Sequence, residues 1–140
     1  MKEITVLFIG SNDNEAKALQ ITLGHRSSST YSFTVRYRPT LEDGLDCIPE
    51  LKEEAQENRT PLTLLVMVDE KAIEQELGDF ISQFKKDYTY PLILYFPEMD
   101  SNKAATLPNT TGAYSVLYGK ILNESNIKTA VLAALKESER

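Results

Sequence analysis

Short apolar runs alternate along the chain with segments whose apolar residues recur every three or four positions. Five of the runs are rich in β-branched and aromatic residues, as β-strands are: 4–9, 33–37, 62–69, 91–96 and 113–118. Helical periodicity marks most of the intervening stretches, which are 12–24, 41–57, 73–84, 99–107 and the residues from 124 onward. Strict strand–helix alternation predicts right-handed crossovers and a central parallel sheet.

The pattern also separates the strands by position. The run 62–69 is apolar throughout, which predicts a strand buried on both faces of the sheet. The run 33–37 alternates apolar and polar residues, which predicts an edge strand. Pro49 lies inside the helical stretch 41–57, so we expect either a kink there or a fresh turn.

Five strand–helix units in 140 residues predict an α/β protein with a single domain spanning 1–140. The expected architecture is a three-layer αβα sandwich with a five-stranded parallel sheet. This arrangement is flavodoxin-like, and its common strand order is 2-1-3-4-5.

Composition limits the classes of function. A net charge of −6 argues against nucleic-acid binding, which relies on basic patches. No apolar stretch approaches the ~20 residues of a membrane span, and no signal peptide opens the chain, so we expect a cytoplasmic protein without membrane partners. The single cysteine, Cys47, excludes an internal disulfide and is interpreted as a reduced core thiol.

One carboxylate ends the most apolar strand. Asp69 follows the run 62–68, at the edge of the sheet where open α/β folds place their chemistry. Its functional interpretation is a reactive carboxylate. The alternative is a solvated residue at the strand end that caps the following helix.

Several segments in order resemble the receiver domain of bacterial response regulators, and the resemblance spans nearly the whole chain. They are the first strand with Leu19 in its helix, the run 41–52 with its acidic-Gly opening, Asp69, the run 91–94, and Gly112–Ala113 followed by Lys120. The resemblance supports the strand order given above. In that family an acidic pair and the strand-three Asp hold Mg²⁺, and that Asp accepts a phosphoryl group.

The resemblance implies site residues, and several are missing here. The positions of the acidic pair hold Gly10 and Ser11, and Phe96 stands where the family has a hydroxyl residue. Asp69 remains a candidate phosphoacceptor and metal ligand. Asp13 is a second metal candidate if its turn is remodelled, and Lys120 is a candidate phosphate-binding residue one position later than the family lysine.

These departures predict a pseudo-receiver, a signalling domain that keeps the fold and acts by protein–protein interaction without efficient phosphorylation. We expect no enzymatic activity and no cofactor. One alternative is a degenerate receiver phosphorylated on Asp69 with Mg²⁺. Another is a flavodoxin-like domain that binds a small anion on the loop 10–13.

Tyrosines gather around the fourth and fifth strands. The resemblance implies that partners dock near this part of the surface, and tyrosine is enriched at interfaces, so Tyr95, Tyr114 and Tyr118 form a candidate partner-binding face. The alternative is that their rings pack under the helices. The implied partners are a histidine kinase, a regulator or an output domain, and a homodimer is also possible.

Overall fold

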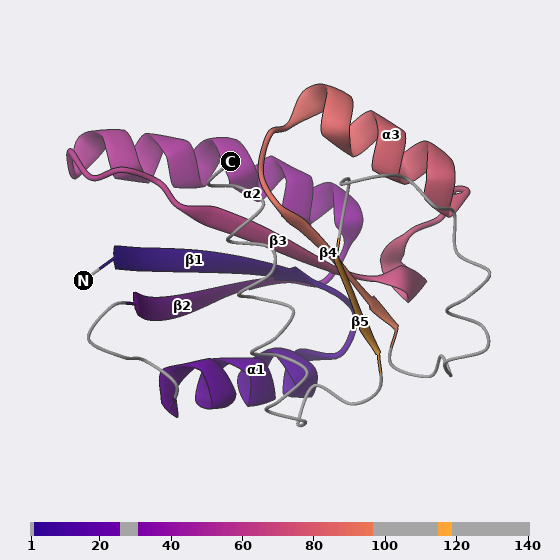
Figure 1. Cartoon of the computed structure of the whole chain (residues 1–140), viewed down its shortest axis with the longest axis horizontal. Helices are drawn as coiled ribbons and strands as arrows, with labels where there is room; N and C mark the ends of the chain where they lie inside the picture. The colour runs from indigo at the N-terminus through magenta and orange to yellow at the C-terminus, as the bar shows by residue number, and fades with distance from the viewer. Residues whose placement is uncertain (1, 26–30, 97–114, 119–140) are drawn as a thin grey trace.

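The computed structural model describes residues 2–25, 31–96 and 115–118. Its five described strands form one parallel sheet in the order β2-β1-β3-β4-β5, which confirms the predicted topology (Figure 1). The strands are β1 Lys2–Ile9, β2 Tyr31–Arg38, β3 Leu64–Asp69, β4 Leu92–Phe96 and β5 Ser115–Tyr118.

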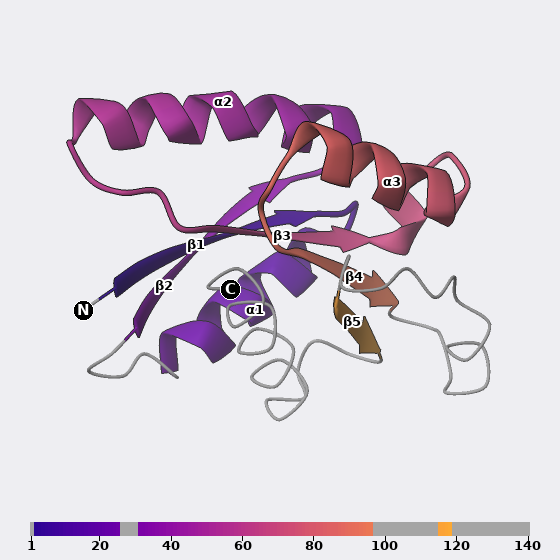
Figure 2. The same cartoon turned by 45° about the horizontal axis from the view of Figure 1, so that its top comes forward.

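Three described helices cover the two faces of the sheet. Helix α1, Asp13–His25, lies on one face, and helices α2, Leu41–Glu57, and α3, Leu77–Asp87, lie on the other (Figure 2). The three-layer αβα prediction is therefore confirmed. The predicted helical stretches 99–107 and 124 onward lie outside the described residues.

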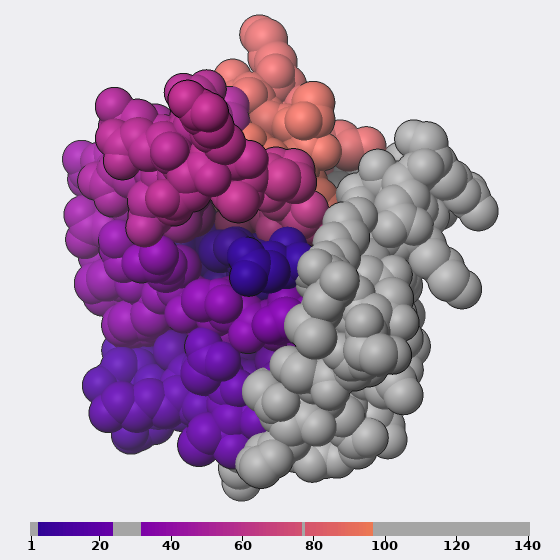
Figure 3. Space-filling model, turned by 90° about the vertical axis from the view of Figure 1, so that its left-hand side faces the viewer, coloured from indigo at the N-terminus to yellow at the C-terminus, as the bar shows by residue number. Residues whose placement is uncertain are grey.

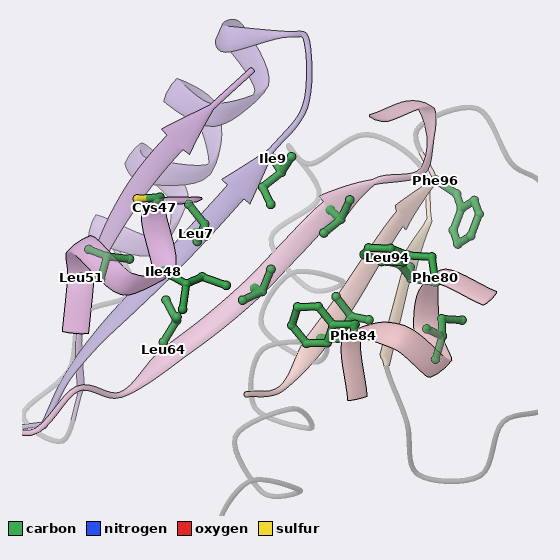
Figure 4. Close-up of a cluster of buried hydrophobic side chains, with 14 residues drawn as sticks. Leu7, Ile9, Cys47, Ile48, Leu51, Leu64, Phe80, Phe84, Leu94 and Phe96 are labelled. Atoms are coloured by element: carbon green, nitrogen blue, oxygen red, sulfur yellow. The ribbon is translucent and has the colours of Figure 1, made fainter. Parts of the chain in front are cut away.

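The sheet is buried on both faces because alternate residues of its central strands serve two separate cores. On β3, Leu65 and Met67 pack under α1, whereas Leu64, Val66 and Val68 pack under α2 and α3. Figure 4 shows the second core, where side chains of α2 and α3 meet those of β1, β3 and β4.

The edge position predicted for β2 is confirmed, because among the described strands it pairs only with β1. Figure 3 views the molecule from the end where the strands begin. The first residues of β1 lie there between the connection from α2 to β3 on one side and β2 with α1 on the other.

Helix α2 has the predicted bounds and runs without interruption through Pro49, so no fresh turn starts there. Its first turn is capped by Thr40, whose Oγ1 accepts a hydrogen bond from the Asp43 amide at 3.2 Å. Cys47 faces the core and is 2% exposed, and burial raises the pKa of its thiol, in keeping with a reduced core residue.

The stretch 73–84 is not one helix. Asp69 is followed by a short 3₁₀ turn, η1 Glu70–Ala72, and Ile73 ends that turn before α3 begins at Leu77. Ile73 still packs against the second core, so its apolar character reflects burial in a loop. The helical spacing of Ile73 with Phe80 and Phe84 is therefore misleading, because a loop residue beneath a helix also contacts the core.

Candidate functional site

Asp69 lies at the carboxyl end of β3 and is 3% exposed, so it is not the solvated residue of the alternative interpretation. Its Oδ1 accepts a hydrogen bond from the Lys71 amide at 3.0 Å. The turn that it caps is η1, whereas the helix α3 begins after Glu76. Burial and capping together fix the carboxylate at the sheet edge.

Gly10, which the resemblance aligns with the first residue of the receiver acidic pair, lies next to the side chain of Asp69. It is buried, and a Cβ atom built on it would lie 3.0 Å from the Cβ of Asp69 and 3.2 Å from the Phe8 ring. Ser11, at the second position, is exposed. Residues 10 and 11 therefore carry no carboxylate, and a side chain at residue 10 would be in tight contact with Asp69.

The second carboxylate of the site is Glu15 in the first turn of α1, a residue that the sequence reasoning missed. Burial raises the pKa of Glu15, the charge of Asp69 raises it further, and the charge of Lys71 lowers it. Its Oε2 is buried and accepts no hydrogen bond from the described part of the chain. Glu15 and Asp69 are thus close enough to repel each other.

Asp13, the predicted metal candidate, faces another direction. Its side chain is 62% exposed and forms an ion pair with Lys17 at 3.8 Å. Burial and the charge of Asp13 raise the pKa of Tyr37 on β2, which places Asp13 toward that strand. The carboxylate coupled to Asp69 is therefore Glu15, and the assignment to Asp13 is corrected.

Helix geometry explains why Glu15, and not Asp13, lies near Asp69. Residues two apart on an α-helix project about 200° from each other, so an outward Asp13 requires an inward Glu15. Once a helix is predicted to start at residue 12 or 13, this periodicity could have identified Glu15. The rotation of the helix about its axis is set by the apolar stripe of Ala16, Leu19 and Leu23. This stripe packs against β1, β3 and β4 in the hydrophobic core on the α1 side of the sheet, called the α1 core below.

These residues offer fewer carboxylates than the Mg²⁺ site that the resemblance implies. Two coupled carboxylates remain, one oxygen of Asp69 is bonded to the Lys71 amide, and the positive charge of Lys71 already acts on Glu15. Among the described residues no group of three or more metal-ligating side chains occurs. Mg²⁺ is usually held by one or two carboxylates together with waters and phosphate oxygens, so Asp69 and Glu15 are the residues that would hold it here.

The loop 10–13 is also a poor anion site. Asn12 caps α1, because its Oδ1 accepts the Asn14 amide at 3.0 Å and its carbonyl accepts the Glu15 amide at 3.2 Å. The first turn also carries Asp13 and Glu15, which repel an anion. The helix N-terminus is thus capped by the chain itself.

The tyrosine face requires one correction. Tyr95 is 1% exposed and packs in the α1 core, with its ring centroid 6.2 Å from that of Phe8. It cannot line a partner-binding surface, because β4 is covered on that face. Tyr118 ends β5 opposite Phe96, whereas Tyr114 and Lys120 lie outside the described residues.

The fold is that of a signal receiver domain. The crystal structure of the signal receiver domain of an HD domain-containing protein from Pseudomonas fluorescens Pf-5 superposes with a TM-score of 0.67. The two chains are 16% identical, and the match covers 99% of this chain and 98% of that one. No family model and no curated protein matches the sequence.

No helix in the described segments is long and apolar enough to cross a lipid bilayer.

Proposed function

We propose that the protein is a pseudo-receiver, a cytoplasmic signalling module of a two-component or related system that acts by protein–protein contact without efficient phosphorylation. Its partners are of the kinds that serve receivers, namely a histidine kinase, a regulator or an output domain. The proposed docking surface lies around β5, with Tyr114 and Tyr118, and does not include the buried Tyr95.

The observation that carries this proposal is the contact between Gly10 and Asp69. A receiver needs carboxylates at the end of its first strand to bring Mg²⁺ to the phosphoacceptor. Here the first of those positions is a buried glycine, and a Cβ atom there would lie 3.0 Å from the Cβ of Asp69. Restoring a carboxylate at residue 10 would require Asp69 to move.

The buried ring of Phe96 supports the same conclusion. It occupies the position of the family's hydroxyl residue after β4, is fully buried, and packs in the core beneath α2 and α3. A phenyl ring cannot donate a hydrogen bond to a phosphoryl oxygen. The binding of a phosphoryl group would therefore lack one of its usual donors.

A second candidate is a degenerate receiver that is phosphorylated on Asp69. It is favoured by the inward orientation of Glu15, which supplies a carboxylate near Asp69 that the sequence pattern does not show. In this case Glu15 would replace the missing acidic pair, and Asp13 would have no role.

Intact-mass spectrometry after incubation with Mg²⁺ and acetyl phosphate distinguishes the two. A pseudo-receiver gains no phosphoryl group, whether as the wild type or as the Asp69→Asn variant. A gain in the wild type that is absent in Asp69→Asn would overturn the proposal.

Two further variants identify the carboxylates involved if such a gain occurs. Loss of the gain in Glu15→Gln but not in Asp13→Asn would establish the second candidate with Glu15 as the helper. Asp13→Asn is the matched control, because Asp13 lies on the same turn of α1 but is exposed and paired with Lys17.

A further inference from the structure

Strand β2 is long and, among the described strands, has a neighbour on one side only. Eight residues, Tyr31–Arg38, pair with β1 alone among the described strands. The segment is rich in β-branched and aromatic residues, which makes it a ready template for another strand. Such an edge pairs with a second copy of itself unless something prevents it.

The direction of the backbone groups on β2 follows from one hydrogen bond. The Gly10 amide donates to the Arg38 carbonyl at 3.1 Å, so the polar groups of Arg38 face β1. Successive residues of a strand present their N–H and C=O groups to opposite sides. The backbone groups of Val35 and Tyr37 therefore face away from the sheet.

Side chains of the same protein bond to both of these outward residues. Gln20, half-buried on α1, accepts a hydrogen bond from the Val35 amide through Oε1 at 2.8 Å. Arg38 donates from Nη1 to the Tyr37 carbonyl, also at 2.8 Å. An incoming strand would need these same two backbone groups, and a side-chain amide and a guanidinium already occupy them.

The guanidinium is itself held in place. Arg38 Nη2 lies 3.7 Å from Glu50 Oε2 on α2, and the neighbouring Arg36 is paired with Glu54 at 3.1 Å. Helices from both faces of the sheet thus send groups to the same edge: α1 through Gln20, and α2 through its carboxylates. This convergence distinguishes the arrangement from a chance contact of one surface side chain.

We propose that Gln20 and Arg38 close the outer edge of β2 against pairing with the β2 strand of a second copy of this chain. The two side chains occupy the Val35 amide and the Tyr37 carbonyl, so that the strand keeps its apolar residues under α1 without offering these two backbone groups to a neighbour. Closure of this edge is independent of whether Asp69 is phosphorylated.

The test uses two substitutions of Gln20 that differ in one property. Gln20→Met keeps the length of the side chain and removes the acceptor oxygen, whereas Gln20→Glu keeps an acceptor. Ile21→Ala is the matched control, since Ile21 is the next residue of α1 and is 60% exposed. Amide hydrogen exchange of Val35 and light scattering over a concentration series are measured for the wild type and each variant.

In the wild type we expect a protected Val35 amide and a β2 edge that does not self-associate. Gln20→Met should exchange the Val35 amide about five- to tenfold faster, as loss of one hydrogen bond implies. It should also self-associate more strongly with rising concentration, and Gln20→Met with Arg38→Met should do so more strongly still. Gln20→Glu and Ile21→Ala should resemble the wild type.

Three results would overturn the proposal. One is a wild type that already pairs through β2, seen as protection of the outward amides that depends on concentration. Another is a Gln20→Met, Arg38→Met double variant that exchanges faster at Val35 yet associates no more than the wild type. The third is equal association of Gln20→Met and Ile21→Ala, which would assign the effect to the surface of α1.

Discussion

Two glycines lie where an added Cβ atom would meet a neighbouring side chain, one in the packing of a helix and one at the candidate site. Gly44 lies on α2 where a Cβ atom would overlap Cδ1 and Cγ1 of Ile9 on β1. Gly10 ends β1 where a Cβ atom would lie 3.0 Å from that of Asp69. The absence of a side chain at Gly44 lets α2 pack close to the sheet. Gly10 stands at a position where the resemblance to receivers implies a carboxylate.

The difference separates a glycine required by the packing of a helix from one that lies at the candidate site. The contact of Gly44 belongs to the apolar packing that holds α2 on the sheet, and the run 41–52 that contains it resembles the receiver family. The contact of Gly10 lies where the resemblance fails. Gly44 thus belongs to the packing of the fold, whereas Gly10 stands where the resemblance implies a carboxylate.

The largest expected effect is at Gly44. Gly44→Ala should destabilise the protein by about 2–3 kcal/mol, because Ile9 is fully buried and its branched side chain has little room to move. Helix propensity alone predicts the opposite sign, a gain of about 1 kcal/mol. Urea unfolding decides between the two, with Glu53→Ala on the exposed side of α2 as the control; a stabilised Gly44→Ala would refute the packing argument.

A smaller loss is expected at Gly10. Gly10→Ala should cost about 1 kcal/mol in the free energy of unfolding, because the Asp69 side chain and the Phe8 ring need to shift by only a few tenths of an ångström. The exposed neighbour Ser11→Ala should be neutral within about 0.5 kcal/mol. If Gly10→Ala costs more than Gly44→Ala in the same urea series, the ranking of the two contacts is wrong.

A third position favours glycine but lacks it. Arg59 follows α2 with a φ of 54°, and the amides of Arg59 and Thr60 donate back to the carbonyls of Gln56 and Ala55. This is a Schellman ending, whose left-handed residue is usually glycine. Arg59→Gly should therefore stabilise the protein by about 0.5–1 kcal/mol in thermal unfolding.

The neighbouring residue provides the control for that change. Asn58 has a φ of −84°, where glycine has no advantage, so Asn58→Gly should destabilise slightly. Equal effects of the two substitutions would show that the positive φ of Arg59 carries no cost.

The smallest effect concerns the charge near Asp69. Burial and the charge of Asp69 raise the pKa of Glu15 in the folded protein, so folding favours the protonated carboxyl. Below the pKa of the unfolded chain the residue is protonated in both states and costs no stability. As the pH rises through the folded pKa the carboxyl ionises, and the folded protein loses stability. Glu15→Gln should consequently stabilise the protein by a few tenths of a kcal/mol, roughly, at neutral pH and by less in acid.

Urea titrations at a series of pH values measure this gain. Asp13→Asn is the control, because it removes the charge of an exposed carboxylate in the same turn of α1. A gain for Glu15→Gln that is independent of pH would contradict a raised pKa of Glu15, which is caused first by burial and then by the charge of Asp69.

Most of the described fold could be predicted from the sequence, because periodicity reflects burial directly. The bounds of α2, the edge position of β2 and the doubly buried β3 all follow from which residues are apolar. Prediction failed at residues 73–76, where an apolar loop residue, Ile73, continues the spacing of the helix that follows it.

The site was less predictable. Asp69 was identifiable because it ends the most apolar strand of the chain. Glu15 was not identified, because choosing between it and Asp13 requires the rotation of α1 about its axis. In the sequence Tyr95 resembles an interface residue. Its burial in the same core as Phe8 and Leu19 shows that its ring is internal.

The sequence by itself determined the alternation of strands and helices, and through it the parallel sheet and the carboxyl edge where Asp69 lies. Those features depend on local periodicity and on chain connectivity. The tertiary structure was needed to show that Gly10 lies against Asp69, that Glu15 turns inward, and that Gln20 reaches Val35. Each of these depends on the distance between elements that are separate in the sequence, and that distance is set by how their side chains pack.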